Sequence, residues 1–255
     1  QADGAPPRGS AAAIWLVRCH AKKGFRRNPP RTLCKTLGFI KNYVKLSARM
    51  NILGYGEDAL TLWAISKKLP VLLEKLGDNS LESECQIFLR PSFGRRGGHN
   101  SSQFGEFDFI LLSRQNLYLG ESKWNRSSEK IENGVIHLRP EQLFRHKLFK
   151  SYVREWFRRK YADWGEFSDS VGKFNFEGYE TEKPVAPKNS LLALNLQTIL
   201  EEVDKQFGEF PAIKNVLLYF HAETPQSELP QEADGDFELI LIDYSDDLFD
   251  NFIRL

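Results

Sequence analysis

Two short apolar runs separated by a polar turn stand out in the middle of the sequence. Residues 107–112 and 117–120 are rich in aromatic and aliphatic side chains, at lengths typical of buried strands. Residues 113–116, with the sequence SRQN, have the composition of a turn. The pattern therefore predicts a β-hairpin.

The rest of the chain alternates between helical and extended patterns. Apolar residues at helical spacing predict helices over 57–77, 139–160 and 191–207, the last capped by Ser190. Apolar runs predict strands over 85–89, 216–221 and 237–244, followed by a short C-terminal helix. Residues 161–189 show no regular pattern beyond room for a short hairpin. This order is typical of an α/β fold.

Composition limits the class of protein. With 255 residues and 41% hydrophobic content, the chain can form one large or two small domains with a substantial core. The net charge is +1, so binding to nucleic acid would need local basic patches. Three widely spaced cysteines without a C-x-x-C motif favour a reducing, cytoplasmic compartment over a disulfide framework or a zinc site. No apolar run approaches the roughly 20 residues of a membrane span, so no membrane partner is expected.

The first 49 residues differ from the remainder. They are Ala-, Pro- and Gly-rich, then basic, without helical or strand periodicity, which predicts an irregular or disordered extension. Met50 is the only methionine, and patterned sequence begins directly after it. We hypothesise that the functional protein starts near Met50, that the upstream part is appended or mistranslated, and that residues 50–255 form one domain. A basic nucleic-acid-binding arm is the alternative.

The hairpin fixes which side chains oppose each other. If residues 114 and 115 form a two-residue loop, Asp108 lies opposite Glu121. Opposed residues share a face of the sheet, with Cβ atoms about 4.5–5.5 Å apart. Lys123, two residues after Glu121, projects from the same face. Two acids and a lysine are thus predicted at one end of an otherwise apolar hairpin.

Two desolvated carboxylates at this distance repel each other, so their placement needs a reason. A divalent cation would remove the conflict, and Mg²⁺ typically takes one or two carboxylates together with waters and phosphate oxygens. The alternative is a surface hairpin end on which these charged residues are incidental.

A strand aspartate, Asp108, followed on the next strand by Glu121-Ser122-Lys123 resembles the PD-(D/E)XK, or restriction-endonuclease-like, nuclease superfamily. Phe107 stands where the motif's proline would be, at a position that is loose across the superfamily. The resemblance covers residues 57–123 at the level of motifs. It implies a central mixed sheet flanked by helices, with an αβββαβ core, and makes 50–255 a single nuclease-like domain.

The resemblance also implies roles for the residues of the motif. Asp108, Glu121 and the carbonyl of Ser122 would hold Mg²⁺, and Lys123 would orient the attacking water and stabilise charge on the phosphate. The reaction would be hydrolysis of a DNA phosphodiester that leaves a 5′-phosphate. Glu57, in the first turn of the first helix, and Gln142, on the helix after the motif, match positions that assist the site in some members. For Glu57 the helix dipole alone is an equal explanation.

Two basic segments are candidates for contacts with DNA. The glycine-rich loop before the hairpin contains Arg95 and Arg96, suited to phosphate contacts, although a plain connector is the alternative. The helix over 139–160 carries eight Lys or Arg and two Glu. On it, Arg154, Arg158 and Arg159 interleave with aromatic residues, a pattern that fits contacts to the nucleic-acid backbone. A solvated basic face is the ordinary explanation.

These features predict a Mg²⁺-dependent endonuclease, with a type II restriction enzyme as the most natural role for a domain of this size. A DNA repair or junction-resolving nuclease is the second interpretation. A binding module that lacks catalysis, or an α/β interaction protein that binds neither metal nor DNA, are the alternatives from other classes. A homodimer is expected if the DNA target is palindromic.

Overall fold

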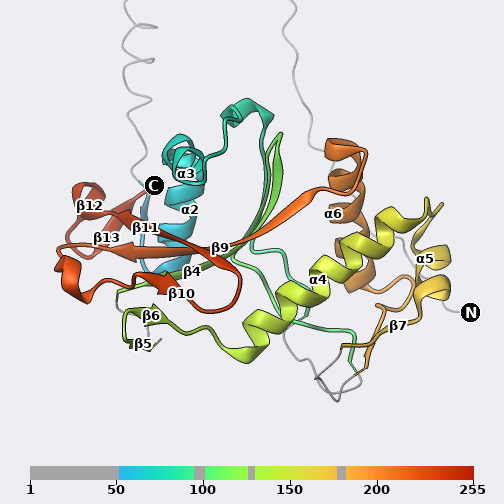
Figure 1. Cartoon of the computed structure of the whole chain (residues 1–255). Helices are drawn as coiled ribbons and strands as arrows, with labels where there is room; N and C mark the ends of the chain where they lie inside the picture. The colour runs from blue at the N-terminus through green and yellow to red at the C-terminus, as the bar shows by residue number, and fades with distance from the viewer. Residues whose placement is uncertain (1–51, 95–100, 126–129, 177–181) are drawn as a thin grey trace, which may run out of the picture. The chain divides into compact units, whose positions relative to one another are not determined.

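The computed structural model of the chain is built around a five-stranded sheet with the order β11-β9-β4-β3-β2 (Figure 1). These strands are β2 (Gln86–Leu89), β3 (Phe109–Leu112), β4 (Asn116–Trp124), β9 (Ala212–His221) and β11 (Phe237–Asp243). The first three pair antiparallel, whereas β9 is parallel to both β4 and β11. The sheet is therefore mixed, with β4 at its centre.

The structure describes residues 52–94, 101–125, 130–176 and 182–255. They belong to one compact unit that spans Asn51–Leu255. The predicted extension over 1–49 lies outside the described residues, as do Arg95 and Arg96 of the glycine-rich loop.

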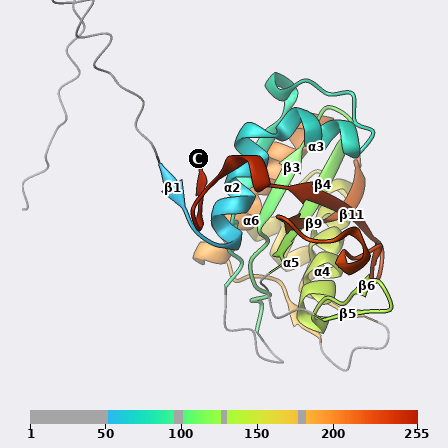
Figure 2. The same ribbon diagram turned by 90° about the vertical axis from the view of Figure 1, so that its left-hand side faces the viewer.

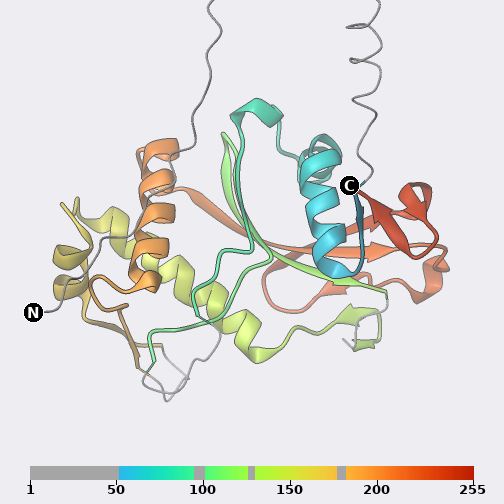
Figure 3. The same cartoon turned by 180° about the vertical axis from the view of Figure 1, so that it is seen from behind.

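Helices cover both faces of the sheet. Helices α2 (Glu57–Lys67) and α3 (Leu69–Lys75) lie on one face, and α4 (Pro140–Arg158), α5 (Trp164–Val171) and α6 (Leu191–Phe207) lie on the other. Figure 2 looks onto the α2 and α3 side, and Figure 3 shows the same layers from behind. Side chains alternate along the strands: Leu111 and Tyr118 pack toward α2, and Ile110 and Leu119 pack toward α4. The prediction of a mixed α/β fold with flanking helices is confirmed.

Shorter strands complete the structure at its margins. A three-stranded sheet has the order β1-β13-β12, another has the order β10-β6-β5, and β7 pairs with β8. Their bounds are β1 Leu53–Gly54, β5 Ile131–Glu132, β6 Val135–Ile136, β7 Lys173–Phe174, β8 Lys183–Pro184, β10 Glu232–Ala233, β12 Leu248–Phe249 and β13 Phe252–Arg254. Among the described residues, no helix has both the length and the apolar character required to cross a membrane.

The register of the predicted hairpin is confirmed. Phe109 pairs with Gly120 and Leu112 with Leu117, which leaves a two-residue loop between Ser113 and Asn116. Gly120 is required inside the strand, because a Cβ atom there would lie 2.1 Å from the ring of Phe109. The Phe109 ring therefore lies against Gly120, and the next pair beyond these two residues is Asp108 and Glu121.

A buried carboxylate anchors the turn of this hairpin. Asp78, after α3, accepts hydrogen bonds from the hydroxyl groups of Ser80, Ser113 and Tyr118 at 2.5, 2.6 and 2.8 Å. Burial raises the pKa of Asp78, but these hydrogen bonds outweigh it and leave the pKa below its ordinary value. The contacts join α3 to the hairpin and so help to fix where the opposite end of the hairpin lies.

Three predicted elements differ in the structure. The single helix over 57–77 is two helices, because Pro70 has no N–H to continue the ladder. The segment read as irregular contains α5, whose N-cap Asp163 accepts from the backbone N–H of Glu166 at 2.9 Å. The predicted C-terminal helix is instead the β12–β13 hairpin, because Asp250 adopts a left-handed φ of 53° that reverses the chain. At Pro70 and Asp250 a local backbone constraint therefore decides the structure, and at α5 a side-chain cap does.

Asp78→Asn should lower the free energy of unfolding by about 1–3 kcal/mol, because buried donors lose part of their acceptor. Since the pKa of Asp78 lies below the unfolded value of 3.8, its contribution is complete above that pH and disappears as the pH falls. Urea unfolding at pH 7 and pH 3, with the exposed Asp246→Asn as the matched control, measures both effects. Equal stability of the two variants at pH 7 would contradict this role.

Candidate functional site

The end of the hairpin brings the two predicted acids together. Asp108 directly precedes Phe109, the first residue of β3, and its N–H donates to the carbonyl of Gly120 at 3.1 Å. Its Oδ2 accepts from the N–H of Ser122 at 2.7 Å. The backbone of β4 thereby holds the Asp108 carboxylate beside Glu121.

The environment of Asp108 disfavours its charge. Burial, followed by the nearby charge of Glu121, raises the pKa of Asp108 to about 7, while Lys123 and the N–H of Ser122 oppose the rise. This carboxyl is therefore much harder to ionise than an ordinary aspartate. A cation bound next to it would stabilise the ionised form.

Glu121 is completely enclosed, and four donors satisfy it. Arg145 donates from Nε to Oε1 at 2.8 Å and from Nη2 to Oε2 at 2.7 Å. His146 Nε2 lies 3.0 Å from Oε1, and Gln142 Nε2 donates to Oε2 at 2.8 Å. Burial alone would raise the pKa of Glu121, but the hydrogen bond from His146 and the charge of Arg145 bring it below its ordinary value.

A buried polar chain continues from His146 away from the site. His146 Nδ1 lies 2.8 Å from Asn215 Oδ1, and Asn215 Nδ2 donates to Asp236 at 2.6 Å. Lys150 donates to the same carboxylate at 2.7 Å. This chain of contacts links the enclosed Glu121 on β4 to Asn215 on β9 and to Asp236 just before β11.

Lys123 and Glu57 meet at the mouth of the same site. Lys123 is almost buried, and its Nζ lies 3.6 Å from Oε1 of Glu57, the first residue of α2. Glu106 precedes β3, and its Oε2 lies 3.1 Å from Nη2 of Arg90. Together with Gly105 and the residues above, these side chains line a polar pocket of about 310 Å³: Glu57, Gly105, Glu106, Asp108, Glu121, Lys123, Gln142 and Arg145.

Most predicted site residues therefore converge. Asp108, Glu121, Lys123, Glu57 and Gln142 share one pocket, although they come from α2, the hairpin and α4. Gln142 has a second task, because its Oε1 accepts from the N–H of Arg139 at 3.0 Å and so caps the start of α4. The N–H of Ser122 is used on Asp108, and a role of its carbonyl as a ligand stays a prediction.

The predicted DNA contacts on α4 lie away from this pocket. At about 1.5 Å per residue, Arg154 is roughly 18 Å along the helix from Gln142. Arg158 pairs with Glu155 at 2.9 Å, and the side chain of Arg159 donates to Ser170 at 3.2 Å. The aromatic residues that interleave with them, Tyr152 and Trp156, are core residues and belong to the buried face of α4. Contacts of the three arginines with the nucleic-acid backbone stay a prediction.

The carboxylate oxygens of the pocket are the type of ligand that a hard cation prefers. Two carboxylates in a polar pocket are the ligands that Mg²⁺ takes, with waters completing its shell. Across the described ranges, no group of three or more His, Cys, Asp or Glu is arranged to hold a metal ion. Each oxygen of Glu121 already accepts twice, which fills its lone-pair positions, so a cation could reach Glu121 only after one donor withdraws.

Sequence reasoning does not single out Arg145, His146 or Asn215. A signal was present nonetheless: the apolar stripe of α4, traced back from Phe149 at helical spacing, reaches His146 and Gln142, which are polar yet buried. Polar residues on a core-facing stripe need partners. Their partner, Glu121, lies on a strand far away in sequence, so the pairing itself could not be read from the chain.

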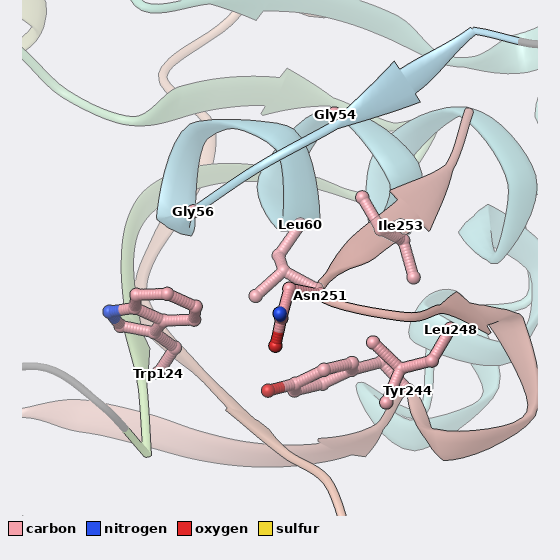
Figure 4. Close-up of a pocket in the computed structure, with 8 residues that line it drawn as sticks. All are labelled: Gly54, Gly56, Leu60, Trp124, Tyr244, Leu248, Asn251 and Ile253. Atoms are coloured by element: carbon pink, nitrogen blue, oxygen red, sulfur yellow. The ribbon is translucent and has the colours of Figure 1, made fainter.

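Two other hollows carry no comparable chemistry. The one in Figure 4 lies beneath β1 and the C-terminal strands, lined among others by Leu60, Trp124 and Tyr244. Its volume of about 20 Å³ suits roughly one water molecule. A hollow of about 400 Å³ between α3 and β11 is mainly apolar. Its carboxylate, Asp243, is already occupied by Ser245.

Asp108→Asn should stabilise the protein at pH 8. The folded state keeps the Asp108 proton up to about pH 7, whereas the unfolded chain loses it near 3.8. The folded state therefore binds more protons in this interval, and wild-type stability falls as the pH rises through it, by at most about 4 kcal/mol. Chemical denaturation of both proteins at pH 4.5 and pH 8 measures the change. A stability difference independent of pH would refute the assignment.

Comparison of the chain with known protein families, with curated proteins and with solved structures finds no match in any of the three. The candidate site therefore stands on its own geometry: an enclosed glutamate, a neighbouring aspartate that resists ionisation, and a lysine at the mouth of a polar pocket.

Proposed function

We propose that the protein is a divalent-cation-dependent nuclease that hydrolyses DNA phosphodiester bonds. The observation that carries the proposal is the pair Asp108 and Glu121 at the end of the β3–β4 hairpin, with Lys123 in the same pocket. A pKa of about 7 for Asp108 marks a position where the folded chain tolerates negative charge poorly. Strongly shifted pKa values cluster at functional sites.

The order of the elements supports the proposal. Helix α2 precedes the antiparallel strands β2, β3 and β4, helix α4 follows, and β9 returns parallel to β4. This agrees with the αβββαβ core implied by the resemblance to restriction-endonuclease-like nucleases. Asp108 directly precedes β3 and Glu121 lies within β4, so both acids are at the open end of the β3–β4 hairpin.

The residues of the pocket divide the chemical work. A bound Mg²⁺, held by Asp108, Glu121 and the carbonyl of Ser122, would act as a Lewis acid and lower the pKa of a water. Lys123 would hold the attacking water and stabilise the charge that develops on the phosphate oxygens. Glu57 orients the Lys123 ammonium group, at 3.6 Å. Gln142 and His146 keep the Glu121 carboxylate ionised and in place.

Among nucleases, we favour a type II restriction enzyme, with a repair or junction-resolving nuclease second. A two-fold dimer would be required for a palindromic target. A non-catalytic DNA-binding module is the rival that a specific observation favours, because all four lone-pair positions of Glu121 are occupied by protein donors.

Plasmid DNA incubated with the protein should be cut in Mg²⁺ and left intact in EDTA. Lys123→Ala should reduce the rate at least about 100-fold while DNA binding persists, because its role lies in the transition state. Lys205→Ala, which removes an exposed lysine on α6, is the matched control. A mobility shift without cutting in any metal would indicate the binding module, and near-normal cutting by Lys123→Ala would remove Lys123 from the mechanism.

Neutralising Arg154, Arg158 and Arg159 together should weaken DNA binding equally on all sequences if α4 follows the phosphate backbone. Each lost contact should flatten the slope of log affinity against log salt by roughly 0.9, so the triple variant could change it by up to about 3. Titrations in Ca²⁺ across a salt series measure the slope. A slope equal to that of the wild type would show that this end of α4 is a solvated face.

A further inference from the structure

Arg145 binds both oxygens of the Glu121 carboxylate, the atoms that a metal cation would otherwise bind. Its two nitrogens bind both oxygens side by side, at 2.8 and 2.7 Å. Arg145 and Glu121 both line the pocket, although the Glu121 side chain is only 1% exposed. Arg145 supplies two of the four donors to Glu121, so its withdrawal would free a position on each oxygen.

We infer that Arg145 closes the site in the absence of substrate. A phosphodiester entering the pocket draws the guanidinium from Glu121 to the phosphate, and this opens Glu121 to a divalent cation. The inference rests on the proposed nuclease function and adds a residue that binds substrate. It also makes the two binding events dependent on each other, because the cation binds well only together with the phosphodiester.

The other donors to Glu121 are fixed by additional contacts. Gln142 also caps the first turn of α4 through Arg139. His146 is 1% exposed, bonded to Asn215, and lies between the rings of Phe107 and Phe237 with centroid distances of 4.7 and 4.6 Å. Withdrawal of either residue would break the helix start or the core.

Arg145 is less enclosed than His146: its side chain is 14% exposed, and its guanidinium lies over the ring of Phe107 at 5.9 Å from the ring centroid. Gly105 faces it, and a Cβ atom at that position would lie 3.0 Å from Nη1, so the absence of a side chain leaves the guanidinium open to the pocket. The planar fork of arginine binds a phosphate in two-point fashion as readily as a carboxylate. Its long side chain can exchange one for the other without a change in the backbone.

The exchange conserves charge compensation. Without a bound phosphodiester, Arg145 compensates the charge of the enclosed Glu121, which would otherwise be costly to keep ionised. When the arginine turns to a phosphate, a divalent cation takes its place. Because each ligand favours the open arrangement, cation and phosphodiester must raise each other's affinity by the same factor, typically about 5- to 150-fold.

Ca²⁺ titration calorimetry on the DNA-free protein tests the inference without catalysis. Arg145→Lys keeps the positive charge but cannot form the two-point contact, so it should bind Ca²⁺ about 5-fold or more tightly than the wild type. Arg90→Lys, at the arginine that pairs with Glu106 in the same pocket wall, is the matched control and should change the affinity less than twofold. Unchanged or weaker Ca²⁺ binding by Arg145→Lys overturns the inference.

A second arm measures Ca²⁺ binding with and without DNA in both proteins. Adding a short DNA duplex should tighten Ca²⁺ binding to the wild type, and the gain should shrink in Arg145→Lys. Equal gains in both proteins would show that the phosphate acts on the cation without Arg145, which also overturns the inference. If the wild type cuts plasmid DNA in Mg²⁺ but these Ca²⁺ results fail, only the role of Arg145 is lost. If no protein binds Ca²⁺ with or without duplex, the proposed nuclease function fails as well.

Discussion

An ionised glutamate in the interior is the constraint on which the site depends. Glu121 lies on the central strand, where a charge without partners would be prohibitively costly. Three residues of one helix turn, Gln142, Arg145 and His146, supply its four donors. The N-terminal end of α4 is thereby tied to the middle of the sheet. Removal of any of these residues would act on the fold and on the site together.

The same constraint organises the surroundings of the site. The second ring nitrogen of His146 is hydrogen-bonded to Asn215 on β9. Asn215 in turn donates to Asp236 just before β11. The polar chain therefore crosses the parallel half of the sheet, where Lys123 also pairs with β9, whereas Asp108 directly precedes β3 in the antiparallel half. Glu121 sits where the two halves meet on β4. A fully satisfied network of this kind fixes the relative positions of the strands that carry the candidate chemistry.

The two acids illustrate how environment separates similar groups. Glu121 has enough donors to stay ionised, whereas Asp108 has the N–H of Ser122 and a carboxylate neighbour, and its pKa rises to about 7. The protein groups of the pocket therefore favour the negative charge of Glu121 and disfavour that of Asp108. A cation that binds here would release the Asp108 proton, so its affinity should increase with pH below neutrality.

Much of this arrangement could be predicted from sequence, because local patterns determine it. The apolar runs and the two-residue loop set the register of Phe109 with Gly120, and the register alone placed Asp108 beside Glu121. What escaped prediction depends on contacts between distant segments. In the sequence Arg145 is one more basic residue on a basic helix, and only the folded sheet brings Glu121 next to it. Tyr152 likewise reads as part of a basic, aromatic helix face, but α5 covers it, and α5 is too short to be predicted from periodicity.

The central claim is that Asp108 and Glu121 together hold a divalent cation at a phosphodiester. The most direct measurement is anomalous scattering from crystals of the protein grown with Mn²⁺ and a DNA duplex. The account predicts one strong peak within ligand distance of both carboxylates, with a phosphate of the duplex beside it and Lys123 close to that phosphate. Mn²⁺ absent from the pocket, or bound elsewhere while Arg145 still pairs with Glu121 beside bound DNA, would contradict it.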